Sequence, residues 1–424
     1  MGPALRFLQV AAGPAAGPTT APTAIGTRIP PEMKTFRDPD TGRTVRQYTA
    51  ADSYSYPLYY FTPPITADGR YAIIHSARTG WIQLYRLDLQ SGEMVQLTAG
   101  ATRDSGWSIW CETHVRGIYN HLSSLNRVRH EVYYFQDEEV RATDIESLAN
   151  RVVLKIPGRM CVSQTNFSPD GRLFAFIHAD RELFRRRIAD LEALQNLRFK
   201  AAWNDEWRHS VPCTIGLIDT ATGRYRDVIH VDFHIHHVIF ADNDTLLVNH
   251  LEHGEGMWRL QVDGAGRREL KRLIHQVVTR RGIYYETPRR LQPANKPDRD
   301  RYANWLGLYD LKTDRFEEVP LPCADGYVHT GWDWMGKFLF FENAGKAHEL
   351  LSLHFPFLPE RTHCRTIRKL EPYPRGGQWV HAHPFLSPDR RWLFHTATIN
   401  GISQVCAVDV ADLVDLDEYW DRRA

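Results

Sequence analysis

Short apolar stretches alternate with turn residues along most of the chain from about residue 45 onward. In the clearest unit, residues 65–100, apolar strand segments are joined by turns at Asp68-Gly69 and Ser91-Gly92. Such pairs between apolar runs are typical of tight β-hairpins. Comparable units follow one another with few helical patterns between them. The sequence therefore predicts a β-propeller, in which each repeat is one small sheet.

Counting these units gives seven blades, which we expect to begin near residues 51, 106, 161, 234, 275, 328 and 380. Residues 34–49 read as an outer strand that closes the last blade, so that few sheet edges stay exposed. Residues 181–203 carry apolar positions at helical spacing and predict a helical insertion in blade three. The expected fold is all-β, a seven-bladed propeller over residues 31–424. Residues 1–30, where Pro and Gly interrupt a short apolar patch, are expected to form a disordered leader.

Composition narrows the functional classes. The chain has 424 residues, 43% of them hydrophobic, and can bury a large core. Its 52 Lys plus Arg nearly balance 51 Asp plus Glu, so charge gives no reason to expect a nucleic acid or an anionic membrane as partner. No apolar run is long enough to predict a membrane-spanning helix. The oligomeric state stays open.

The six cysteines are widely spaced and contain no C-x-x-C pair. We interpret them as separate core thiols of a reducing compartment, although the spacing does not exclude a disulfide. Together with the weak leader, this pattern predicts a cytoplasmic protein.

Four histidines share one register. His237, His275, His329 and His383 each stand nine residues before the start of the second strand of a blade, in four consecutive blades. The first strand of a propeller blade lines the central channel, so these imidazoles are expected to converge. Strand alternation would put His381 on the same face as His383.

Gln378, three residues before His381, is expected to enter the channel beside them. Imidazole nitrogens with a carboxamide oxygen suit a divalent ion that keeps open positions, and the lack of thiolates argues against a closed structural zinc site. A single strand histidine is more often a hydrogen-bonded side chain than a ligand, so the hypothesis depends on convergence of the whole set.

Two segments resemble those of a known family. "QWVHAHPFLSPDRRWLFHTATINGISQVCAVDV" and "GYVHTGWDWMGKFLFF" are similar to the last two blades of oligogalacturonate lyases, seven-bladed propellers that cleave short pectin fragments by β-elimination using manganese. The resemblance implies Mn²⁺, or another divalent cation, and an oligouronide substrate. It also implies His275 as the general base, His237 in the substrate pocket, and a metal bound by His329, Gln378, His381 and His383.

The chain departs from the family pattern at several positions. Gly256 and Thr214 stand where the family has arginines, and Tyr56-Pro57 replaces a histidine-containing pair. Arginine grips a sugar carboxylate through two parallel hydrogen bonds, so these changes weaken the case for galacturonate fragments. Other arginines could bind the substrate carboxylate in their place, or could simply be solvated charges of loops. These are Arg280, Arg281, Arg289, Arg290 and Arg375.

Two other readings remain open at this point. One is the same chemistry on a different uronide, and the other is a non-catalytic propeller scaffold of the TolB-like kind. The proton donor to the leaving group is not identified. Aromatic side chains could stack on sugar faces, although most aromatics of a propeller pack between blades; the candidates are Tyr60, Trp110, Trp332 and Trp379.

Overall fold

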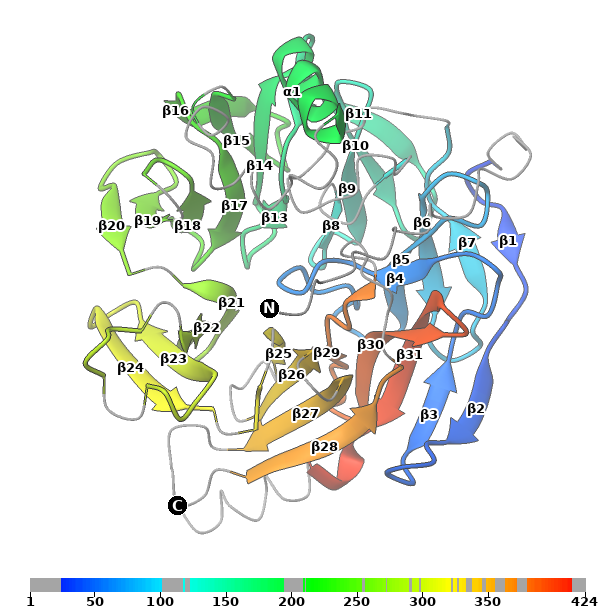
Figure 1. Ribbon diagram of the computed structural model, residues 1–424. Helices are drawn as coiled ribbons and strands as arrows, with labels where there is room; N and C mark the ends of the chain where they lie inside the picture. The colour runs from blue at the N-terminus through cyan, green and yellow to red at the C-terminus, as the bar shows by residue number, and fades with distance from the viewer. Residues whose placement is uncertain are drawn as a thin grey trace.

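Seven antiparallel sheets form a ring around a central axis in the computed structural model of the chain (Figure 1). They correspond to the seven blades expected from the sequence. The structure describes residues 24–413 except for 101–116, 119–122, 194–208, 210, 254–255, 272, 290–291, 297–298, 322, 326–327, 333–337, 345–347, 355–362 and 372–379.

The strands of each blade follow one another from the channel outward, as Figure 1 shows. Blade one contains β4 (Ser55–Pro57), β5 (Tyr71–Ser76), β6 (Gln83–Asp88) and β7 (Met94–Gln96), with β1 (Arg28–Ile29) at its edge. Blade two contains β8 (Ser123–Asn126), β9 (Glu131–Gln136), β10 (Glu139–Asp144) and β11 (Asn150–Lys155). Blade three contains β12 (Arg159–Cys161), β13 (Asn166–Phe167), β14 (Leu173–Asp180), β15 (Cys213–Asp219) and β16 (Tyr225–Val231).

The remaining blades repeat this plan. Blade four contains β17 (Ile235–Phe240), β18 (Thr245–His250), β19 (Gly256–Gln261) and β20 (Arg268–Leu270). Blade five contains β21 (Ile274–Thr279), β22 (Gly282–Pro288), β23 (Asn304–Asp310) and β24 (Arg315–Pro320). Blade six contains β25 (Val328–Trp332), β26 (Phe338–Ala344), β27 (His348–His354) and β28 (His363–Lys369). Blade seven contains β29 (Phe385–Leu386), β30 (Trp392–Ile399), β31 (Ile402–Asp409), β3 (Thr44–Gln47) and β2 (Lys34–Arg37).

N-terminal strands close the ring. β3 pairs with β31, with Val45 opposite Val408, and β2 pairs with β3 at the rim. The expected closure is therefore confirmed, and two strands perform it. The boundary placed at residue 30 needs correction, because β1 already pairs with the edge of β7. Residues 1–23 lie outside the described part of the chain, and their assignment to a leader stays a prediction.

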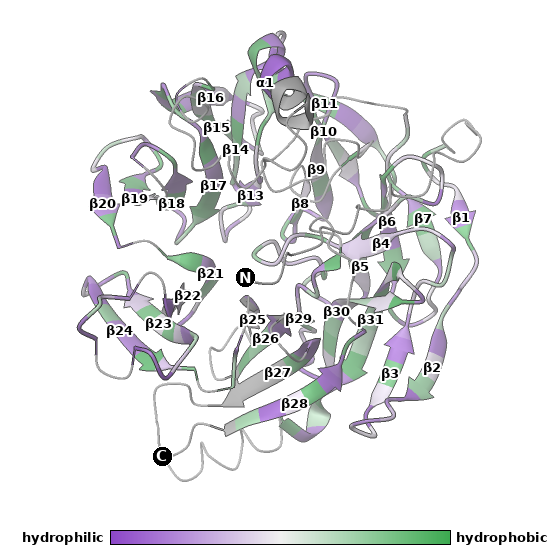
Figure 2. Cartoon of the chain, viewed as in Figure 1, coloured by the Kyte–Doolittle hydropathy of each residue, from purple (hydrophilic) through white to green (hydrophobic). Residues whose placement is uncertain are grey.

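Burial follows the radial position of each strand. All six residues of β5 are buried, whereas every residue of β24 is exposed or half-buried. Central strands lie between the faces of neighbouring blades, while outer strands meet solvent. Figure 2 shows a hydropathy contrast between the mostly hydrophobic β17 near the channel and the hydrophilic β3 in the outer part of blade seven.

Helix α1 (Arg181–Ala193) follows β14 directly in blade three. The Asp180 carboxylate accepts a hydrogen bond from the backbone N–H of Leu183 at 2.8 Å, as a helix N-cap does. The helix overlaps residues 181–203, but residues 194–208 lie outside the described ranges, so the helical insertion in blade three stays a prediction. In the ranges that the structure describes, every helix is too short or too polar to cross a membrane.

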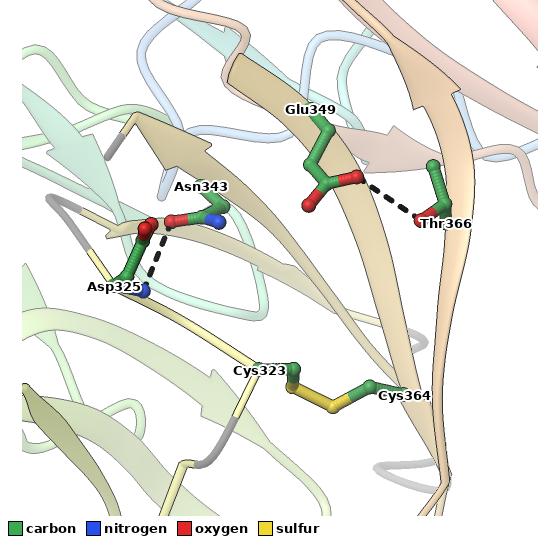
Figure 3. Close-up of a disulfide and its surroundings, with 6 residues drawn as sticks. All are labelled: Cys323, Asp325, Asn343, Glu349, Cys364 and Thr366. Atoms are coloured by element: carbon green, nitrogen blue, oxygen red, sulfur yellow. Dashed lines mark hydrogen bonds between the residues drawn. A yellow bond between two sulfur atoms is a disulfide. The ribbon is translucent and has the colours of Figure 1, made fainter. Parts of the chain in front are cut away.

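One disulfide corrects the interpretation of the cysteines as separate thiols. Cys323, which follows β24, is bonded to Cys364 of β28, with their Cα atoms 6.3 Å apart (Figure 3). Cys161 and Cys213 are buried free thiols, and burial raises the pKa of each to about 12. The disulfide removes the argument for a reducing compartment that depended on isolated thiols, so cytoplasmic residence stays a prediction.

Candidate metal centre

Four of the predicted histidines gather in one cluster. The ring of His329 lies with its centroid 4.5 Å from that of His381, 4.5 Å from that of His383 and 4.7 Å from that of His275. His329 is therefore the centre of the group. Gln378 lies outside the described residues, so its predicted role as a ligand is a proposal.

Backbone irregularities aim these side chains. His275 and His383 have φ of 49° and 40°, a left-handed conformation that residues other than glycine seldom adopt. The pairing of β21 with β22 also shifts register between Ile274 and Val277, as a β-bulge does. His381 and His383 precede β29 and do not lie within a strand, so simple alternation, which the sequence suggested, is not what places them on one side.

A close approach of two backbones joins blade six to blade seven. A Cβ atom on Gly331 of β25 would collide with the carbonyl oxygen of Pro384, the residue after His383. Glycine at this position therefore lets the chain carrying His383 lie against the strand carrying His329.

Buried carboxylates orient the imidazoles. Nδ1 of His329 and Nδ1 of His381 lie 3.0 Å and 3.2 Å from the two oxygens of Glu342. Nδ1 of His275 lies 2.6 Å from a carboxylate oxygen of Glu286. A carboxylate that accepts from Nδ1–H fixes the tautomer, so Nε2 carries the lone pair that can bind a metal or take a proton.

Glu342 is the hub of this arrangement. It is fully buried, and it also accepts hydrogen bonds from Nε2 of His348 at 3.2 Å and from the backbone N–H of Ala382 at 3.1 Å. Burial pushes the pKa of Glu342 upward, but the nearby His381 and the hydrogen bonds from the imidazoles outweigh burial and hold the pKa well below 4.5. Glu342 is therefore a carboxylate at neutral pH.

The imidazoles of His329 and His383 are neutral in the folded protein. Burial, and then the neighbouring His381, lowers the pKa of His329 well below 6.5. Burial, and then the neighbouring His329, does the same for His383. A neutral imidazole is the form of histidine that binds a metal.

The donor set fits a divalent cation. His329, Glu342 and His381 each place one possible ligand atom within 4.8 Å of the others. Nε2 of His383 is buried, and among the described residues it has no hydrogen-bond partner, as expected of an atom held ready for a ligand. Because the Glu342 oxygens hold the Nδ1 atoms of His329 and His381, the donors left for a first-row divalent ion are the imidazole Nε2 atoms.

An aromatic segment covers the cluster. The ring centroid of Tyr60 lies 5.5 Å from that of His329 and 5.9 Å from that of His275, and the Tyr59 ring lies 5.0 Å from the His383 ring. His237 meets the same segment, with its ring centroid 6.2 Å from that of Tyr59. Of the four aromatic candidates, Tyr60 thus lies at the site. Trp110, Trp379 and the side chain of Trp332 are outside the described part of the chain.

Sequence reasoning missed the second-strand partners of the histidines. Glu286, Glu342 and Asn249 follow their histidines by 11, 13 and 12 residues and face them across the first hairpin of the blade. The available signal was the polar residue that directly follows the apolar run of each second strand, as in "GIYYETP", "FLFFENA" and "TLLVNH".

Two of the candidate arginines, Arg280 and Arg281, lie away from the cluster. Arg280 and Arg281 form the turn after β21, and His275 lies at the other end of that strand, roughly 15 Å away at the usual rise per residue. The Arg289 side chain donates to the carbonyl of Tyr302 at 2.9 Å. Arg290 and Arg375 lie outside the described ranges.

Comparison with solved structures identifies proteins of similar fold. Oligogalacturonate lyase from Vibrio parahaemolyticus has a TM-score of 0.71 and 18% identity, over 91% of this chain and 99% of that one. An oligogalacturonate lyase in complex with manganese has the same TM-score and identity, over 91% of this chain and 98% of that one. No protein-family model and no curated protein matches the sequence. At this identity the likeness establishes the fold, a seven-bladed propeller.

Proposed function

We propose that the chain is a metal-dependent lyase that acts on short uronic-acid oligosaccharides by β-elimination, with Mn²⁺ as the favoured cation. The observation that carries the proposal is the pair formed by His275 and Glu286. The ring centroid of His275 lies 4.7 Å from that of His329. A base held by a carboxylate thus stands beside a set of metal donors. The manganese complex among the similar structures supports the choice of cation.

The reaction breaks the C4–O bond of a uronate and forms a C4–C5 double bond. The C5 proton is only weakly acidic, and a bound divalent ion would supply Lewis-acid neutralisation of the adjacent carboxylate. His329, His381 and His383 would hold the ion, with Gln378 as a further proposed ligand. The C5–H electron pair becomes the double bond, and the departing oxygen takes a proton from water or an acid.

His275 is the proposed base. Its Nδ1–H donates to Glu286, so Nε2 can accept the C5 proton. Glu286 is buried, and its carboxylate then stabilises the imidazolium that forms, as the acidic member of a catalytic triad does. The Tyr60 ring against His275 and His329 helps to keep water from the reacting atoms.

A uronide other than galacturonate is the second candidate substrate. An arginine at position 256 is incompatible with the local packing, because a Cβ atom there would collide with the ring of His250. The carboxylate grip of the family is therefore absent at this position. The metal donors and the base do not depend on it.

Ultraviolet absorbance tests the proposal, because a new C4–C5 double bond is conjugated to the carboxylate. Manganese-loaded protein is incubated with digalacturonate, trigalacturonate and a panel of other uronides. Absorbance that EDTA abolishes is the expected result, and signal only on another uronide would identify the second candidate.

Two variants separate the roles of the residues. His275→Ala should abolish absorbance while Mn²⁺ binding in calorimetry stays intact, whereas His383→Ala should weaken Mn²⁺ binding itself. Silence of the wild-type protein across the panel, with no Mn²⁺ bound, would refute the lyase proposal and favour a scaffold.

A further inference from the structure

Three polar side chains connect the proposed base to the blade that carries His237. Asn249 Oδ1 accepts a hydrogen bond from Gln276 Nε2 at 2.6 Å and another from His237 Nδ1 at 3.1 Å. Gln276 follows His275 directly in β21, while Asn249 lies in β18 of the next blade. The chain of hydrogen bonds therefore links blade four to the residue that follows the proposed base.

One backbone carbonyl fixes the direction of this hydrogen-bond chain. Asn249 Nδ2 donates to the carbonyl oxygen of Leu273 at 3.4 Å, and a carbonyl can only accept. Asn249 must therefore turn Oδ1 toward its other two neighbours. It follows that Gln276 presents its amide nitrogen to Asn249, and that His237 carries its proton on Nδ1.

The same logic points the carbonyl oxygen of Gln276 away from Asn249. Gln276 is fully buried, and its Oε1 has no hydrogen-bond partner among the residues that the structure describes. A buried acceptor without a donor is costly, so such an atom calls for a donor from a ligand. Gln276 directly follows the proposed base His275, and the register shift between Ile274 and Val277 includes both residues.

We propose that Gln276 Oε1 accepts a hydrogen bond from a ring hydroxyl of the uronate that reacts at His275, and that Asn249 is the positioning residue that holds Gln276 in this orientation. This inference rests on the proposed function and adds a substrate group that selects hydroxylated uronides. The amide oxygen can accept a hydrogen bond from a hydroxyl but not from a carboxylate, so Gln276 would recognise a hydroxyl of the sugar ring and not the carboxylate.

Calorimetric titration of manganese-loaded protein tests the inference as a double-mutant cycle. The His275→Ala background prevents turnover. The ligands are digalacturonate and two analogues that lack the 2-hydroxyl or the 3-hydroxyl of the reacting unit. Gln276→Met removes the acceptor at similar volume, and Gln261→Met at the outer end of β19 is the matched control.

Loss of a neutral hydrogen bond should raise the Kd of digalacturonate by about tenfold in Gln276→Met and not in the control. In the protein that keeps Gln276, one of the two analogues should bind about tenfold more weakly than digalacturonate. Gln276→Met should not weaken the binding of that analogue any further. Asn249→Leu should reproduce that lost discrimination with Mn²⁺ affinity unchanged, which a general folding defect would not do.

The opposite results are equally clear. If Gln276→Met weakens the binding of both analogues as much as it weakens that of digalacturonate, the assignment of Gln276 is overturned. Absorbance with uronides in the wild-type protein would still support the lyase proposal in that case. Binding that shows the expected coupling without elimination would support Gln276 and refute the lyase. No binding of any uronide would overturn both.

Discussion

Replacing Cys323 and Cys364 together by serine should destabilise the protein by about 4 kcal/mol in the chain-entropy description of disulfides. The two residues are 41 positions apart in sequence. Closing a loop of that length removes about 13 cal/mol/K of entropy from the unfolded chain, which is about 3.9 kcal/mol at 25 °C. The effect acts on the unfolded state, because the double variant leaves no unpaired thiol in the native one.

Native contacts around the disulfide should survive the substitution. The backbone N–H of Asp325 donates to the Asn343 side chain at 3.3 Å, and Thr366 donates to Glu349 at 3.0 Å, as Figure 3 shows. These contacts tie the same segments to blade six without the sulfur bridge. Most of the expected loss is therefore entropy of the unfolded chain.

Scanning calorimetry measures the change. For 424 residues the entropy of unfolding is about 0.9 kcal/mol/K near 60 °C, so a loss of about 4 kcal/mol corresponds to a fall of about 4 °C in Tm. Wild-type protein treated with dithiothreitol should show the same fall, whereas the double variant should not respond to it. An unchanged Tm, or six titratable thiols in unreduced, denatured wild-type protein, would refute the reasoning.

Three further predictions concern the metal centre and acid stability. Glu342→Gln should weaken Mn²⁺ binding 10- to 100-fold in calorimetric titration, because it loses the charge that orients His329 and His381. The control Glu349→Gln should leave Mn²⁺ binding unchanged. Equal Mn²⁺ affinities of the two variants would contradict this role of Glu342. Gly331→Ala should cost roughly 1–3 kcal/mol in denaturant unfolding and weaken Mn²⁺ binding, because its Cβ displaces Pro384, and a variant of wild-type stability would count against that close approach. Burial and the charge of Arg368 lower the pKa of His395 to about 3, so below about pH 6.5 the unfolded chain binds a proton that the folded protein does not. The contribution to stability is full above that pH and falls toward pH 3 by at most about 1.4 kcal/mol per pH unit. His395→Leu should flatten this slope in urea titrations at several pH values.

Much of the fold could be predicted because its signals are local. Asp-Gly and Ser-Gly turns mark the hairpins, and the apolar run between them marks each buried strand, so all seven blades and the closing strand at residues 34–49 were found. The extra edge strand β1 has only two residues and carries no such signal. It forms because Arg28 and Ile29 meet the unpaired edge of β7.

The site could be predicted only in part. Histidines repeat in one register because each blade repeats one geometry, and this repetition placed His275, His329 and His383 together. Their carboxylate partners were missed because Glu286 and Glu342 look like ordinary strand residues until the second strand is paired with the first. The disulfide was missed for a similar reason, since cysteines 41 residues apart become neighbours only through the packing of blade six.

Preorganisation is what separates this histidine cluster from a chance gathering of imidazoles. Four histidines lie within the cluster, but their usefulness depends on which nitrogen faces inward. Glu342 and Glu286 decide that for His329, His381 and His275 by accepting from Nδ1 in each case. Asn249 decides it for His237 in the same way, so one device recurs in three consecutive blades. A scaffold does not require two buried carboxylates that fix imidazole tautomers, because each buried charge costs free energy unless it is fully paired. A centre that must present lone pairs to a cation and a proton does need them, and this need favours the catalytic interpretation of the channel over the structural one.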